Sequence, residues 1–181
     1  TNRYFALIDS VADTIDKCHD AKQKAALLLI RAVAYSDTQN NEAAIDDLTA
    51  VVQLDSTQTL AYWQRAVCQA RLNAFNASQG TDISMKTANV LSDLSEAIEN
   101  NPSAILYYNR GNVYVQRKDY LHAIEDYSKA IEMDSHLAEA YYNRGIARLA
   151  LKQQAQAVAD LSKAGELGLY AAYSIIKQNR K

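Results

Sequence analysis

The spacing of apolar residues predicts that nearly the whole chain is helical. An apolar stripe at helical intervals opens the sequence, through Tyr4, Ile8, Val11, Ile15 and Cys18. At the other end, Gly165 and Gly168 are typical of a helix C-terminus, and a last helix is expected over 170–181. Polar turn-forming residues from Asn73 to Asp82 predict a break in the helical pattern between these two ends.

Composition supports this prediction. The 181 residues include only five glycines and one proline, and the abundant Ala, Leu, Gln, Glu and Lys favour helices. There are twelve tyrosines against two phenylalanines and one tryptophan. Because tyrosine suits packed positions with one edge in water, these tyrosines are expected at the border between the core and solvent.

A pentapeptide, Tyr-Tyr-Asn-Arg-Gly, occurs at 107–111 and again at 141–145. The two pentapeptides are 34 residues apart. The segments stay similar beyond them, since Asp126 and Asp160 are separated by the same 34 residues. A catalytic loop would not need a copy, whereas a helix pair that stacks on itself to bury its apolar face would.

The period continues toward the N-terminus. Leu28 and Tyr62 are separated by this interval as well, but Tyr62 and Tyr107 lie farther apart. The excess falls between Leu72 and Val90, which predicts an insertion in one repeat.

These units resemble the tetratricopeptide repeat family, in which a unit of about 34 residues forms two antiparallel helices. Each begins with a bulky residue, at Leu28, Tyr62, Tyr107 and Tyr141. A small residue follows four places later, at Ala32, Ala66, Gly111 and Gly145. The second helix carries a small or β-branched residue, at Ala44, Val90, Ala123 and Ala157. The resemblance implies an all-α, right-handed superhelical solenoid of antiparallel helix pairs, and its style is that of bacterial members.

The resemblance also predicts the organisation of the chain as one continuous solenoid domain. Residues 1–24 form an N-terminal helix, either a cap or the end of a truncated preceding repeat. The expected repeats are 25–58, 59–103 with an insertion at about 73–87, 104–137 and 138–169, and 170–181 form a capping helix. The insertion either contacts a partner or lacks order, and the sequence leaves both open.

Two charged positions recur in every repeat. The first helices carry Arg31, Arg65, Arg110 and Arg144, and the second helices carry Asp47, Asp93, Asp126 and Asp160. Facing helices of a hairpin place these positions at similar heights, so a ladder of ion pairs is expected. The ladder either fixes helix register or forms a row that binds anions, and we favour the structural role.

The concave face of such repeats comes mostly from the first helix of each pair. The resemblance places nine side chains there: Trp63, Gln64, Arg71, Tyr108, Asn109, Asn112, Gln116, Tyr142 and Asn143. Carboxamides can donate to and accept from a peptide backbone, and aromatic rings supply contact area with few rotors. A carboxylate clamp known in some family members is not expected, because Tyr108 and Tyr173 stand where two of its lysines would be.

Several other classes are not indicated. Net charge is −2 with no Lys/Arg run longer than two, so nucleic acid is not an expected partner. The longest apolar run, Ala25–Ile30, is far shorter than the roughly 20 residues that span a bilayer. His19, His122 and His136 are scattered, and no catalytic or metal-binding motif occurs, so neither a cofactor nor a metal is expected. Two cysteines suggest no disulfide framework.

The sequence therefore predicts a non-enzymatic module that binds a peptide or protein segment in a concave groove. One alternative is an assembly scaffold, as part of a longer solenoid or a homo-oligomer. Another is a regulatory domain of a larger protein. The chain begins at Thr1 rather than Met, so a fragment is expected, and its compartment and partner are not assigned.

Overall fold

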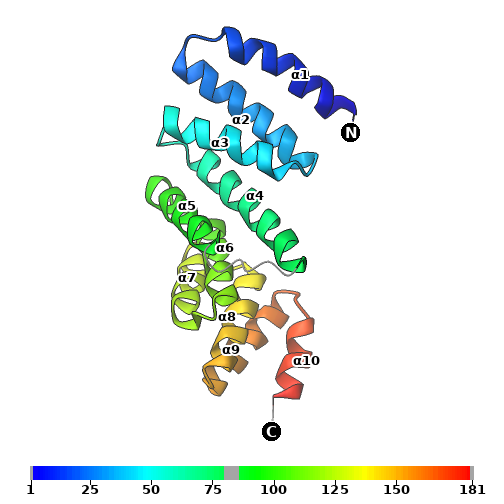
Figure 1. Ribbon diagram of the computed structural model, residues 1–181. Coiled ribbons are helices and arrows are strands. Elements are labelled where there is room, and N and C mark those ends of the chain that lie inside the picture. Colours follow the sequence, from blue (N-terminus) through cyan, green and yellow to red (C-terminus); the bar gives the residue numbers. More distant parts are fainter. Residues whose placement is uncertain (1, 80–85, 180–181) are drawn as a thin grey trace. The chain divides into compact units, whose positions relative to one another are not determined.

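The computed structural model describes residues 2–79 and 86–179, in which every regular element is a helix (Figure 1). The chain divides into two compact units, Thr1–Asn101 and Pro102–Lys181. The first unit contains α1 (Asn2–Lys17), α2 (Ala21–Asp37), α3 (Asn41–Leu54), α4 (Thr59–Ser78) and α5 (Lys86–Asn100). The second contains α6 (Ala104–Gln116), α7 (Tyr120–Met133), α8 (Ala138–Ala150), α9 (Gln154–Glu166) and α10 (Ala171–Gln178). None of these helices is long and apolar enough to cross a bilayer.

In the first unit each helix packs against the next, from α1 to α5. The apolar stripe predicted for the first helix is confirmed for Ile8, Val11 and Ile15, which are buried, whereas Tyr4 is 39% exposed. Val11 and Ile15 join a core cluster with Leu28 of α2. Cys18, in contrast, lies beyond the end of α1, where its thiol donates to the carbonyl of Asp20.

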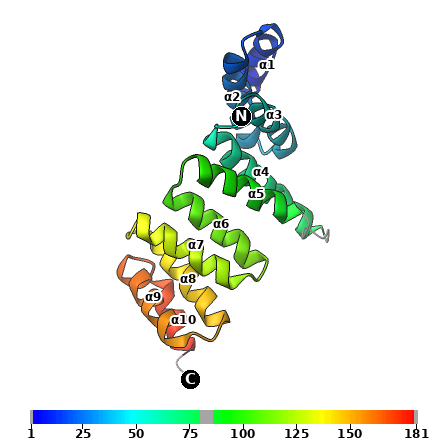
Figure 2. The same ribbon diagram turned by 90° about the vertical axis from the view of Figure 1, so that its left-hand side faces the viewer.

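The second unit stacks two helix pairs, α6 with α7 and α8 with α9, and α10 covers α9 (Figure 2). Its last core cluster joins Leu161 and Ala164 of α9 to Ala172 and Ile176 of α10. The predicted C-terminal helix is thus present as α10, although residues 180–181 lie outside the described residues.

Glycine ends the repeated pentapeptide because the paired helices come very close at that point. A Cβ atom on Gly111 would lie 2.7 Å from Cε1 of Tyr127, and one on Gly145 would lie 2.8 Å from Cγ of Leu161. Both partner side chains are at most 1% exposed. The absence of a side chain on α6 and α8 therefore makes room for a large residue on α7 and α9.

Three of the turns between paired helices, and the turn after α9, share one geometry. A residue with positive φ closes each turn: Gln39 (64°), Lys118 (60°), Lys152 (60°) and Gly168 (102°). The next residue donates its N–H to a carbonyl five residues earlier, from Asn40 to Tyr35, Asp119 to Tyr114, Gln153 to Arg148 and Leu169 to Ala164, each at 2.9 Å. This is the Schellman arrangement, which satisfies carbonyls left open at a helix end.

The helix break predicted over Asn73–Asp82 begins later than expected, because α4 does not end at Asn73. This residue corresponds to Gln39 in the period of the chain, yet α4 continues helically through it to Ser78. Asn73 is buried, and Ala74 follows where Asn40 caps α3 in the regular turn, so the stop signal is missing. Alanine and leucine near this point favour continuation. Of the expected insertion, residues 80–85 lie outside the described residues.

A glycine at a left-handed turn residue should stabilise the second unit. Lys118 has φ of 60°, a conformation that costs a non-glycine residue about 1 kcal/mol. We predict that Lys118→Gly raises the free energy of unfolding by roughly 0.5–1 kcal/mol in urea titrations. Lys118→Ala is the control, because it removes the same side chain and keeps the strain. An equal gain in both variants would contradict the backbone explanation.

Adding one methyl group at the helix crossing should have the opposite effect. In Gly111→Ala the new Cβ overlaps the ring of Tyr127, a rigid side chain packed in the core. We predict a loss of about 1–2 kcal/mol in thermal or urea unfolding, despite the better helix propensity of alanine. The second variant, Gly111→Ala with Tyr127→Leu, should recover part of the loss, because Leu48 and Leu94 occupy the matching place opposite Ala32 and Ala66. Unchanged stability in Gly111→Ala would show that α6 and α7 leave room for a Cβ atom beside the ring of Tyr127.

Candidate functional site

Each of the four recurring arginines faces its aspartate across a helix pair. In every pair the arginine Nε and Nη2 donate to the two carboxylate oxygens at 2.6–2.9 Å. The pairs are Arg31–Asp47, Arg65–Asp93, Arg110–Asp126 and Arg144–Asp160. The aspartates are only 4–6% exposed, so each carboxylate depends on its arginine to replace the water it has lost.

A tyrosine covers each guanidinium. The ring centroid lies 5.6–5.9 Å from the central carbon of the guanidinium, for Tyr35 on Arg31, Tyr62 on Arg65, Tyr107 on Arg110 and Tyr141 on Arg144. The first tyrosine of the pentapeptide therefore packs on the arginine of the same pentapeptide. This contact orients the planar guanidinium while it forms the fork with the carboxylate.

Two of the arginines also reach the preceding helix pair. Arg65 Nη1 donates to Thr49 Oγ1 of α3 at 3.1 Å, and Arg144 Nη1 donates to Ser128 Oγ of α7 at 2.9 Å. Thr49 and Ser128 each follow the large core residue of their helix by one position. In Arg65 and Arg144 the aspartate and the hydroxyl use Nε, Nη2 and Nη1, so little donor capacity is left for an external anion. For these two arginines the contacts favour the structural role over anion binding.

A polar cluster lies beside this ladder in the second unit. Asn112 Oδ1 accepts two hydrogen bonds, from Tyr127 Oη at 2.7 Å and from Asn143 Nδ2 at 2.9 Å. Asn143 Nδ2 also lies 3.3 Å from the hydroxyl oxygen of Tyr108, and the rings of Tyr108 and Tyr127 are 6.0 Å apart. We call these four residues the Asn–Tyr cluster. It joins α6, α7 and α8, so three of the nine predicted groove residues come together here.

Sequence reasoning missed the fourth member, Tyr127. This residue is 1% exposed, and an aromatic residue at this place in a helix pair is expected only to pack between the helices. Burial, more than any charge, raises the pKa of its phenol well above the usual value of 10.0, so it remains a hydrogen-bond donor at neutral pH. The available signal was its hydroxyl, since Leu48, Leu94 and Leu161 stand at the same place in the other helix pairs.

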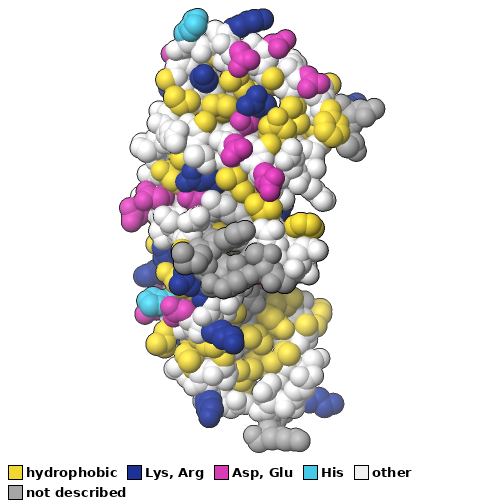
Figure 3. All heavy atoms as spheres, in the orientation of Figure 1, with side chains coloured by type: hydrophobic (Ala, Val, Ile, Leu, Met, Phe, Trp, Pro, Cys, Tyr) yellow, Lys and Arg dark blue, Asp and Glu magenta, His cyan; other side chains and the backbone are white. Residues whose placement is uncertain are grey.

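The other expected groove residues are dispersed. In the second unit Asn109 and Tyr142 are half-buried and Gln116 is exposed. Tyr142 packs against the core cluster of α9 and α10. Hydrophobic side chains gather on the face of the second unit that Figure 3 shows. Trp63, Gln64 and Arg71 belong to the first unit, and Arg71 donates to Ser36 Oγ at 3.0 Å.

The described residues contain no candidate metal site. No group of three or more His, Cys, Asp and Glu side chains among them is placed to hold a metal ion. His122 pairs with Asp119 at the surface, 2.8 Å apart, and stacks on Tyr114.

Removing one arginine of the ladder should destabilise the protein strongly. Arg110→Ala leaves Asp126 buried without the bidentate donor it has now. We predict a loss of about 3 kcal/mol in urea unfolding and a clearly lower Tm. Arg110→Ala combined with Asp126→Ala should cost less than the single change, because no buried charge remains. If Arg110→Ala left the free energy of unfolding and Tm almost unchanged, the ladder would not be a source of stability.

Parts of this chain are similar in sequence to known repeat proteins. A family model described as TPR repeat matches residues 111–152. The human protein "Tetratricopeptide repeat protein 13" is 30% identical over 111 residues, which cover 59% of this chain and 12% of that protein. The chain thus spans about an eighth of the length of this relative.

Solved structures share the fold over most of the chain. The crystal structure of MamA superposes with a TM-score of 0.78 and 24% identity, covering 92% of this chain and 89% of that one. That of YrrB, described as a TPR protein with an unusual peptide-binding site, gives a TM-score of 0.72 and 16% identity over 96% and 87%. With the matched repeat and the human relative, these likenesses confirm the resemblance seen in the sequence: residues 111–152 match a tetratricopeptide repeat, and the chain shares the all-α fold of these solved structures.

Proposed function

We propose that this protein is a protein-interaction module that binds an extended peptide segment through the Asn–Tyr cluster of its second unit. It acts by binding rather than by catalysis. The buried aspartates that could otherwise serve as bases have arginine partners at 2.6–2.8 Å. The partner is a protein or peptide, and nucleic acid does not suit the net charge of −2.

The observation that carries this proposal is the shared acceptor at Asn112. Because Tyr127 and Asn143 both donate to its Oδ1, the two carboxamides are held in one orientation. None of the hydrogen bonds among the described residues uses Asn112 Nδ2 or Asn143 Oδ1. A fixed donor and a fixed acceptor on neighbouring helices match the N–H and C=O groups of an extended peptide.

Preorganisation gives this cluster an advantage over mobile surface amides. The carboxamides of Asn112 and Asn143 are half-buried and already restrained, so binding immobilises few further rotors. Tyr108 adds an aromatic surface whose hydroxyl is within reach of Asn143. The peptide-binding site named for YrrB supports this class of function for a protein with the same fold.

A second candidate function is assembly through the end of the second unit. Tyr170 and Tyr173 of the α10 region are 73% and 46% exposed, which is unusual for large aromatic side chains. As a scaffold, the protein would use this end to join another copy. Sedimentation across a range of concentrations separates the two functions, because a peptide-binding module stays monomeric.

The test is selection of phage-displayed random peptides on the wild-type protein, followed by calorimetry with a selected synthetic peptide. We predict that Asn112→Ala with Asn143→Ala weakens binding at least tenfold, since two backbone hydrogen bonds are lost. Leu121→Ser is the matched control, because Leu121 is 63% exposed on α7 and lies outside the cluster. Circular dichroism and Tm establish that each variant is folded.

Equal affinity in all three proteins would place peptide binding elsewhere on the chain. Failure to select any peptide on the wild-type protein would count against the proposed function itself and favour the assembly role.

A further inference from the structure

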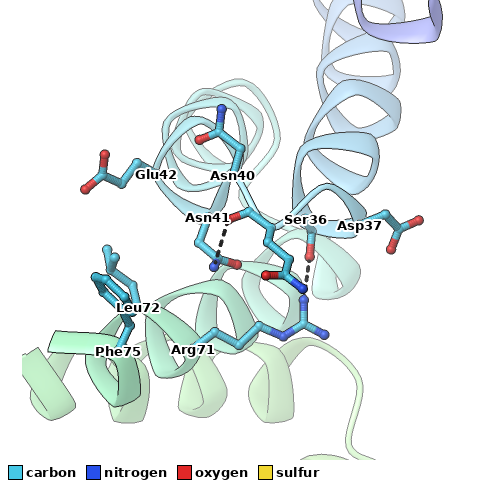
Figure 4. A pocket seen from close by; sticks show the side chains of 9 residues that line it. Ser36, Asp37, Asn40, Asn41, Glu42, Arg71, Leu72 and Phe75 are labelled. Atoms are coloured by element: carbon cyan, nitrogen blue, oxygen red, sulfur yellow. Dashed lines mark hydrogen bonds between the residues drawn. The ribbon is translucent and has the colours of Figure 1, made fainter. Parts of the chain in front are cut away.

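A separate pocket of about 790 Å³ lies in the first unit, at the rim where α2, α3 and α4 meet (Figure 4). Its volume falls in the range of natural ligand sites. Asp37 of α2 and Glu42 of α3 lie at opposite ends of it, and Leu72 and Phe75 of α4 form an apolar wall (Figure 4). None of these four residues belongs to the Asn–Tyr cluster.

The apolar wall exists because α4 does not stop where the corresponding helices stop. In the other helix pairs the first helix ends before a left-handed turn residue, whereas α4 runs to Ser78. Phe75 therefore belongs to the extra helical segment. It is 62% exposed, the highest value for a phenylalanine in the described residues, although a phenylalanine gains most from burial.

The polar side of the pocket suits a donor rather than an anion. The N-terminus of α3 is already satisfied, because Asn40 accepts from the N–H of Ala43 and Glu42 lies in the first turn. Asn41 Oδ1 is shielded from solvent and has no hydrogen-bond partner in this part of the structure, although its Nδ2 donates to the carbonyl of Gln39. An incoming N–H group would supply the missing bond.

The distribution of charge in the first unit also favours a cationic partner. Among the side chains that line the pocket, Asp37 and Glu42 carry two negative charges and Arg71, which donates to Ser36 Oγ, carries one positive charge, so the lining has a net charge of −1. Residues 1–101 contain thirteen Asp/Glu and eight Lys/Arg, a net charge of −5, whereas residues 102–181 have a net charge of +3. Several acidic side chains are visible over the helices of the first unit (Figure 3). A cationic partner is therefore attracted to this unit.

We propose that this rim pocket docks an extended peptide segment in which an aromatic or aliphatic residue is followed, two positions later, by lysine or arginine. The apolar side chain packs on Leu72 and Phe75, the cation approaches Glu42, and a backbone N–H donates to Asn41 Oδ1. The extra helical segment of α4 thus acts as the wall of a second docking site, independent of the Asn–Tyr cluster.

The experiment is an NMR titration of the isotope-labelled full chain with two synthetic peptides, Gly-Ser-Phe-Ser-Lys-Ser-Gly and the same sequence with Glu in place of Lys. Residues two apart in an extended segment share one face, so Phe and Lys both meet the pocket. We expect the Lys peptide to shift the amide signals of Gln39–Glu42 and Arg71–Phe75. The Glu peptide should bind at least tenfold more weakly.

Two variants test the proposed contacts. Phe75→Ser should reduce affinity for the Lys peptide about tenfold through lost apolar contact, and Leu60→Ser, at the exposed start of the same helix, should not. Glu42→Lys should reverse the preference between the peptides, whereas Glu96→Lys on the exposed face of α5 should leave it in place.

Three results would overturn the proposal. They are equal binding of the two peptides, shifts confined to Asn112 and Asn143, and concentration-dependent self-association that Phe75→Ser abolishes. The second result would still leave the Asn–Tyr cluster as a peptide site, so failure here is separate from failure of the proposed function. The third would make a second copy of the chain the occupant of the pocket.

Discussion

The close crossing of paired helices is the constraint on which the structure depends. Where α6 crosses α7 and α8 crosses α9, a single added carbon atom would overlap the opposite side chain. At the matching place in α2 and α4 the residues are Ala32 and Ala66, exposed by at most 1%. One helix pair of this kind leaves an apolar face uncovered, so the next pair must stack on it.

The same crossing explains why charged residues occur so close to the core. Helices this near leave no room for water, so a polar group there needs a partner of fixed geometry. The arginine–aspartate forks meet that need, and the hydroxyls of Thr49 and Ser128 extend two of them to the preceding pair. The Asn–Tyr cluster differs in one respect: its bonds leave a donor on Asn112 and an acceptor on Asn143. We infer from this difference that the cluster, unlike the ladder, is a candidate surface for a ligand.

Much of this fold could be predicted from the constant interval between repeats, because that interval reflects stacking of like units. The helical state, the buried stripe of α1 and the final helix followed from local patterns. The continuation of α4 through Asn73 did not, since asparagine both ends helices and tolerates burial when neighbouring residues favour the helix. Tyr127 was missed for a related reason: a buried aromatic residue predicts packing, and only three-dimensional proximity shows that its hydroxyl meets Asn112.

Site-specific photocrosslinking is the most direct test of whether the Asn–Tyr cluster binds a peptide. A benzophenone amino acid placed at Tyr108, within the Asn–Tyr cluster, is compared with one at Leu121, which is exposed on α7. A selected peptide is irradiated with each protein, and the adducts are counted by mass spectrometry. If the peptide binds at the Asn–Tyr cluster, adducts form at residue 108 and none form at residue 121. Adducts at 121 alone, or at both sites equally, would contradict a peptide site at the cluster.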